Sequence, residues 1–181
     1  MSDCKNDEYD NIYKYKYIKY KQKYVTHKYI VQYGNGMDEN YEEIYGNLFN
    51  SKTESIAHCI SSDVKMGKGI AAEFRKKYGG IKKILDQKPT MGNICVLRRK
   101  NRWIYYLITK EFYWEKPTYD SVKKCLENMK RHMEEHGVKS LAMPQIGCGL
   151  DKLKWESVRK IIKEIFPPDC KINITIYILK K

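Results

Sequence analysis

Apolar residues along this chain recur at two different spacings, and the two spacings alternate from residue 43 to the C-terminus. Alternating or continuous apolar runs predict strands, whereas apolar residues three and four positions apart predict helices. Strands are predicted at residues 43–45, 55–60, 93–98, 103–109, 140–143 and 172–179. Helices are predicted at residues 69–78, 81–86, 119–136 and 154–166. Strands interspersed with helices predict a three-layer α/β/α domain around a mixed, mostly parallel sheet of about six strands.

Each of the two longest predicted helices has a continuous stripe of apolar residues along one face. In the first, one face holds Val122, Cys125, Leu126, Met129 and Met133. Thr118 is its candidate N-cap and Gly137 its stop signal. In the second, the apolar face consists of Trp155, Val158, Ile162 and Ile165 before Pro167 and Pro168 end the helix. We interpret both stripes as core and not as cofactor-binding surfaces.

Residues 1–42 differ from the predicted domain at 43–181. They hold nine tyrosines and balance seven lysines with seven acids, and a Lys/Tyr run extends from Tyr13 to Tyr24. Such a segment buries little apolar surface, which predicts a mostly disordered extension. Three alternatives stay open: compositional drift without a function, an edge strand, and a strip that binds nucleic acid through lysines and stacked rings.

Composition narrows the class of protein. The net charge of +13 comes wholly from residues 43–181, which suits phosphates, nucleotides or nucleic acid, although a solvated lysine-rich surface explains it equally well. No apolar run suggests a membrane span or signal peptide, so we expect a soluble intracellular protein without a membrane partner. The six cysteines are scattered, with no CxxC pair and no spacing suited to zinc, which predicts free thiols.

Candidate chemistry follows three of the predicted strands, at the ends where ligands collect in open α/β sheets. Ser61 and the loop MGKGIA (66–71) follow one strand, Lys110 follows the next, and PQIGCGLD (144–151) follows a third. Both glycine loops lead to predicted helix N-termini, where backbone N–H groups bind anions. Neither loop is a Walker A or GxGxxG motif. Together they indicate a nucleotide diphosphate site that needs no metal, although glycines after strands are often only turns.

Lys110 and Asp151 are the reactive candidates beside these loops. A lysine amine can attack a carbonyl-like carbon, and a carboxylate across the site can shuttle protons. The alternative is structural: Lys110 is solvated, and Asp151 caps the helix that follows it.

At these residues the sequence resembles the macrodomain family, in particular its terminal ADP-ribose protein glycohydrolases, also called O-acyl-ADP-ribose deacylases. The resemblance rests on GNLF (46–49), SIAHCIS (55–61), MGKGIAAEFRKKYGG (66–80), IYYLITK (104–110), KPTY (116–119) and MPQIGCGLDKLKWE (143–156). These segments occur in order between Ile44 and Leu179. The resemblance implies a macrodomain fold without a metal or redox cofactor, and a nuclear (nucleoplasmic and nucleolar) or cytoplasmic location.

The resemblance also assigns roles to residues. It implies that Lys110 attacks C1″ of the distal ribose, and that Asp151 helps to resolve the resulting lysyl–ADP-ribose. Implied substrates are ADP-ribosylated proteins modified on Asp or Glu and O-acetyl-ADP-ribose, with poly-ADP-ribose or nucleic acid as further partners of the basic surface. Implied ligand contacts are Asn47, Leu48, Ser61, Gly67, Gly69, Ile70, Gln145, Ile146, Gly147, Cys148, Gly149, Leu150 and Leu179.

Two positions depart from the family pattern. Asn47 stands where the family has an aspartate that accepts from the adenine amino group, which predicts a weaker, neutral hydrogen bond. Lys68 stands where a small residue is expected, and it would clasp a phosphate or narrow the site. Two other functions stay open: an ADP-ribose reader without catalysis, and a nucleic-acid-binding protein whose affinity falls steeply with salt.

Overall fold

The computed structural model describes residues 40–179, so the predicted Tyr/Lys extension lies outside the described residues except at positions 40–42. The strands are β1 (Tyr41–Tyr45), β2 (Ser55–Ser61), β3 (Ile94–Arg99), β4 (Arg102–Lys110), β5 (Ser140–Pro144) and β6 (Asn173–Ile178). The helices are the 3-10 helix η1 (Leu48–Asn50), α2 (Gly69–Tyr78), α3 (Ile81–Leu85), α4 (Tyr119–Glu135) and α5 (Trp155–Ile165). Every predicted element is present within a few residues of its predicted bounds.

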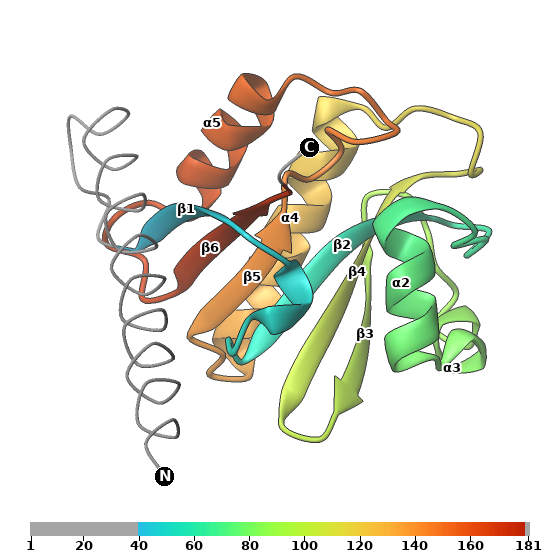
Figure 1. The fold of residues 1–181 in the computed structure, drawn as a ribbon, viewed down its shortest axis with the longest axis horizontal. Helices are drawn as coiled ribbons and strands as arrows, with labels where there is room; N and C mark the ends of the chain where they lie inside the picture. The colour runs from blue at the N-terminus through green and yellow to red at the C-terminus, as the bar shows by residue number, and fades with distance from the viewer. Residues whose placement is uncertain (1–39, 180–181) are drawn as a thin grey trace, which may run out of the picture. The chain divides into compact units, whose positions relative to one another are not determined.

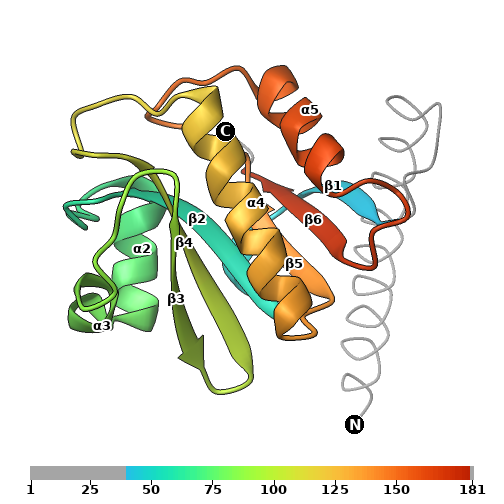
Figure 2. The same cartoon turned by 180° about the vertical axis from the view of Figure 1, so that it is seen from behind.

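The strands form one mixed sheet in the order β1-β6-β5-β2-β4-β3. All neighbouring strands are parallel except β3 and β4, which form an antiparallel hairpin at one edge. Helices α4 and α5 cover one face of this sheet, and α2 and α3 lie on the other (Figures 1 and 2). The structure therefore confirms the predicted three-layer α/β/α domain with a mostly parallel sheet.

Alternating residues of β4 show how the strand pattern produces two cores. Tyr105 and Leu107 face the α4 and α5 side, whereas Ile104, Tyr106 and Ile108 face the α2 side. All five side chains are fully buried. Because successive side chains of a strand point to opposite faces, a strand covered on both faces must be apolar throughout.

Helix α4 is defined by its sequence at both ends. Thr118 accepts a hydrogen bond from the Ser121 backbone N–H, and the Ser121 hydroxyl accepts one from the Thr118 N–H, which completes a capping box. Gly137 follows the helix with a φ of +64°. The predicted stripe from Val122 to Met133 is fully buried, as are Val158 and Ile162 of α5. The structure therefore confirms that both apolar stripes belong to the hydrophobic core.

The edge strand β1 begins earlier in the sequence than predicted. Strand β1 starts at Tyr41 and pairs with β6 through Tyr45, so Tyr41 and Glu42 belong to the sheet although they were placed in the extension. Asn40 joins it by accepting the Ile174 N–H at 2.7 Å. Among residues 40–179, no helix is long and apolar enough to cross a membrane.

Candidate active site

Lys110 is the last residue of β4, at the carboxyl edge of the parallel strands. The pairing of β2 with β4 shifts between Ile60 and Ser61, so that Ser61 lies opposite Lys110. Just beyond, the Ser62 N–H donates to the Lys110 carbonyl at 3.0 Å. Two flanking contacts therefore fix the backbone of Lys110, and its side chain begins from a rigid position.

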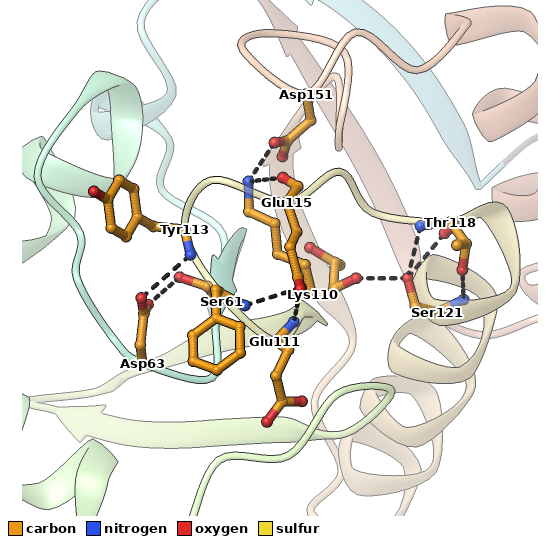
Figure 3. A network of polar contacts seen from close by, with 11 residues as sticks. Ser61, Asp63, Lys110, Glu111, Tyr113, Glu115, Thr118, Ser121 and Asp151 are labelled. Carbon is orange, nitrogen blue, oxygen red and sulfur yellow. Dashed lines mark hydrogen bonds and ion pairs between the residues drawn. The ribbon is translucent and has the colours of Figure 1, made fainter.

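The amine of Lys110 forms an ion pair with Asp151, which comes from the loop after β5 (Figure 3). Lys110 Nζ lies 2.5 Å from Asp151 Oδ1, and the two side chains are only 12% and 18% exposed. Asp151 does not serve as the N-cap of α5, because that position belongs to Lys154. The solvated-lysine and helix-cap alternatives are thus wrong for this pair.

Glycine geometry brings Asp151 to this place. Gly147 has a φ of +68°, and a Cβ there would lie 2.7 Å from Leu153 Cδ1. The Leu153 N–H also donates to the Gly147 carbonyl at 2.9 Å. Only glycine permits this tight turn without strain and without a clash. The turn folds the chain back so that Asp151 faces Lys110.

A second loop, residues 111–115, holds the lysine from the other side. Lys110 Nζ donates to the Glu115 backbone carbonyl at 3.0 Å. The Glu115 carboxylate accepts the N–H groups of Glu111 and Phe112 at 3.2 and 3.1 Å. Glu115 therefore contacts the amine through its main chain and the start of its own loop through its side chain (Figure 3).

Asp63 fastens the same loop to the end of β2. Its carboxylate accepts from the Ser61 hydroxyl at 2.5 Å and from the Tyr113 and Lys65 N–H groups, each at 3.2 Å. Desolvation alone would raise the pKa of Asp63, but these hydrogen bonds and the charge of Lys65 together lower it. A carboxylate that stays ionised keeps the loop in place over a wide pH range.

The two predicted glycine loops meet. Gly69 begins α2 with a φ of +57°, and a Cβ there would lie 3.6 Å from Leu150 Cδ1 of the other loop. Neither Lys68 nor Lys154 caps its helix with a side-chain hydrogen bond. Uncapped N-terminal N–H groups beside glycines suit an anionic group such as a diphosphate.

The predicted ligand residues differ in exposure. Leu48, Ser61 and Ile146 are buried, and the Ser61 hydroxyl is engaged with Asp63. Asn47 is exposed, but its side-chain oxygen accepts the Phe49 N–H at 2.9 Å and caps η1. The residues that are partly or largely exposed are Gly67, Gly69, Ile70, Gln145, Gly147, Cys148, Gly149, Leu150 and Leu179. Their contacts with a ligand stay predictions.

Neither cysteine near the Asp151 loop offers a thiolate that could compete with Lys110. Burial raises the pKa of Cys59, and the neighbouring Cys125 and Asp151 raise it further. Burial also raises the pKa of Cys148 to about 11. Protonated thiols are poor nucleophiles, so neither cysteine is a candidate nucleophile as a thiolate. Among the described residues, no group of three or more His, Cys, Asp and Glu side chains could hold a metal ion.

Sequence reasoning missed Glu115 and Asp63. Both act by accepting backbone N–H groups, and such contacts leave no residue-specific signal at the donor positions. The stretch EFYWE directly after Lys110 was the available signal, because two acids and three exposed aromatic rings stand beside a candidate nucleophile. Phe112 and Trp114 stack there with ring centroids 4.7 Å apart.

Comparisons with known proteins show which family the chain resembles. A profile of the Macro domain matches residues 57–162, which include Lys110 and Asp151. The chain is 50% identical to human ADP-ribose glycohydrolase OARD1 over 137 residues, or 75% of this chain and 90% of the relative. It is 27% identical to the DNA ADP-ribosyl glycohydrolase of Thermus aquaticus over 131 residues, 67% of this chain and 36% of the relative.

Solved structures show the same fold. The macrodomain of Thermus aquaticus DarG superimposes with a TM-score of 0.70 at 23% identity, covering 76% of this chain and 97% of the other. Thermosipho africanus DarTG in complex with ADP-ribose gives a TM-score of 0.69 at 20% identity, covering 77% of this chain and 42% of the other. The mixed sheet and its two helical layers are thus an arrangement shared with distant relatives.

Proposed function

We propose a hydrolytic function for this chain, which belongs to the macro domain family: it releases ADP-ribose from acidic side chains of modified proteins. The observation that carries the proposal is the ion pair between Lys110 and Asp151, placed where two glycine loops meet at the carboxyl edge of the sheet. The 50% identity to an ADP-ribose glycohydrolase over most of both chains supports the same activity.

The proposed reaction begins with the Lys110 amine. The amine gives up a proton, for which Asp151 Oδ1 at 2.5 Å is the nearest acceptor, and Nζ attacks C1″ of the distal ribose. The bond from C1″ to the ester oxygen breaks, and its electrons leave on the Asp or Glu carboxylate. Water then displaces the lysine from C1″, with Asp151 returning the proton to nitrogen, and ADP-ribose is released.

The same site is proposed to deacylate O-acetyl-ADP-ribose, in which an acyl group is likewise attached to the distal ribose. The diphosphate would lie along the glycine loop that begins α2 and the loop from Gln145 to Leu150. Asn47 and Leu48, which follow the carboxyl end of β1, would contact the adenine. Leu179 follows the carboxyl end of β6, the strand next to β1.

A direct assay tests the proposal. The protein is incubated with a peptide that carries ADP-ribose on a glutamate ester, and free ADP-ribose is measured by chromatography. Release well above the spontaneous rate is expected. Binding of ADP-ribose without release would instead favour the second candidate, a reader. The partly buried Lys–Asp pair favours catalysis, because a reader requires no nucleophile there.

Binding of a polyanion such as poly-ADP-ribose or nucleic acid is a separate proposal. It is supported by the basic charge, since residues 43–181 carry 28 Lys and Arg against 15 acids. Such binding should weaken steeply with salt, as each neutralised phosphate releases counterions. A salt titration of binding to a labelled oligonucleotide, followed by fluorescence anisotropy, tests it. Undetectable binding at 50 mM salt would rule it out.

A further inference from the structure

Two acceptors from different loops determine where the Lys110 nitrogen lies. One is Asp151 Oδ1 at 2.5 Å, and the other is the backbone carbonyl of Glu115 at 3.0 Å. A lysine side chain has four rotatable bonds and otherwise samples many positions. With only one acceptor the nitrogen could still swing about that contact, so the second acceptor fixes its direction of approach to an electrophilic carbon.

The position of the Glu115 carbonyl depends in turn on the Glu115 side chain. One carboxylate oxygen, Oε2, accepts the N–H groups of Glu111 and Phe112, which are the first two residues after Lys110. The Glu115 N–H also donates to the Phe112 carbonyl at 3.1 Å. These bonds close residues 111–115 into a compact loop, and the closed loop returns the Glu115 carbonyl to the amine.

The same loop is also anchored to the segment that follows β2. Asp63 holds the Tyr113 N–H, and the Asp63 N–H donates to the Glu111 carbonyl at 3.3 Å. The loop residues from Glu111 to Lys116 are all exposed, so they add little to the folding free energy. Loss of the Glu115 carboxylate should therefore loosen the Glu115 end of the loop, whose carbonyl contacts the Lys110 amine, without unfolding the domain.

From these contacts we propose that Glu115 is a positioning residue: its carboxylate orders the loop that sets the Lys110 amine against Asp151. The proposal rests on the proposed function, in which Lys110 is the nucleophile. Glu115 itself does not need to touch the substrate. Its contribution is to geometry, because a shift of a reacting atom by about 1 Å can cost about 100-fold in rate.

Three variants separate geometry from charge. Glu115→Ala removes both hydrogen bonds from the loop. Glu115→Gln removes the charge but keeps an amide oxygen whose two lone pairs can accept both N–H groups. Glu111→Gln is the matched control, because it removes the same charge from the same loop while the Glu111 backbone contacts remain.

For Glu115→Ala we expect kcat to fall by about 10- to 100-fold while KM and the Kd for ADP-ribose change by less than about threefold. Glu115→Gln should recover most of kcat, and Glu111→Gln should match the wild type. The rate at which an amine-reactive reagent modifies Lys110, followed by peptide mass spectrometry, should also differ between Glu115→Ala and the wild type. Melting temperatures of all variants should stay within a few degrees of the wild type.

Several outcomes would overturn the inference. Wild-type kcat in Glu115→Ala would show that the loop does not position the amine. A parallel loss of ADP-ribose affinity would show that the loop binds the ligand, and failure of Glu115→Gln to recover activity would show that charge matters and not position. If the wild type releases no ADP-ribose, the proposed function itself fails. If Lys110→Ala keeps full activity, the role of Lys110 as nucleophile fails, and if only Glu115→Ala keeps it, the positioning role alone fails.

Discussion

Lys110 and Asp151 stand 41 positions apart in the sequence, yet their side chains meet at 2.5 Å with 12% and 18% of their surfaces exposed. Two mostly buried opposite charges stabilise each other, and removal of one leaves the other without its partner in a poorly solvated place. Every substitution at this pair therefore has a possible structural consequence as well as a chemical one, and the experiments below include variants that separate the two.

Lys110→Ala should abolish hydrolysis of ester-linked ADP-ribose and keep ADP-ribose binding, because the amine attacks C1″ but does not hold the diphosphate. Lys110→Arg should be equally inactive, since a guanidinium stays protonated and cannot attack, while its charge can still pair with Asp151. Product release and calorimetric binding are measured for both variants. Hydrolysis at the wild-type rate by either one would eliminate Lys110 as the nucleophile.

Asp151→Ala should slow resolution of the lysyl–ADP-ribose more than its formation, because proton transfer by a positioned group contributes roughly 10²–10⁴-fold in rate. Intact-protein mass spectrometry should then detect an adduct that maps to Lys110. The Lys110→Ala/Asp151→Ala double variant is the control and should carry no adduct. An equal adduct on the double variant would exclude Lys110, and the lack of one on Asp151→Ala after long incubation would argue against the covalent route.

Deletion of residues 1–38 should leave the melting temperature and activity close to those of the full chain, because the family resemblance and the periodic core begin later and Asn40, which bonds to β6, is retained. Deletion of residues 1–42 should lower the melting temperature by roughly 5–10 °C, since it removes several part-buried hydrogen bonds and the pairing of Tyr41 and Glu42 with β6. These include the Asn40 side-chain bond to the Pro167 carbonyl at 2.9 Å and the Glu42 bond to Thr175 at 2.8 Å. Equal melting temperatures for the two deletions would contradict this boundary.

Acid should destabilise the fold through His58. Its ring is fully buried, stacks on Phe74 with centroids 3.8 Å apart and meets the edge of Tyr106. Burial lowers the pKa of His58 to about 3. The unfolded chain therefore binds the proton first, and stability is lost progressively as the pH falls from 6.5 towards 3.

At pH 5 this effect should amount to about 2 kcal/mol of unfolding free energy. His58→Phe keeps an aromatic ring on Phe74 but cannot titrate, so it should lose less stability than the wild type between pH 7.5 and 5. Urea unfolding at both pH values gives the comparison. The other histidines are unchanged in the variant, and identical pH dependence in the two proteins would refute the assignment to His58.

The elements of this fold could be predicted from the sequence because their signals are local. Hydrophobic spacing located all six strands and four helices, and Thr118 and Gly137 marked the ends of α4. Strand β1 was placed two residues late, because Tyr41 and Glu42 pair only with β6, which lies more than 130 positions away. A partner so distant leaves no trace in the local pattern.

The candidate site was predicted in part. Strand ends and glycine loops identified Lys110 and Asp151 as residues of one rim, since parallel strands bring their carboxyl ends to one edge. Their direct contact, the meeting of Gly69 with Leu150 and the contact of the Glu115 carbonyl with the amine were decided by the tertiary structure alone. The physical reason is that these contacts depend on turn geometry and on backbone N–H and carbonyl groups, which nearly every residue carries and no sequence pattern distinguishes.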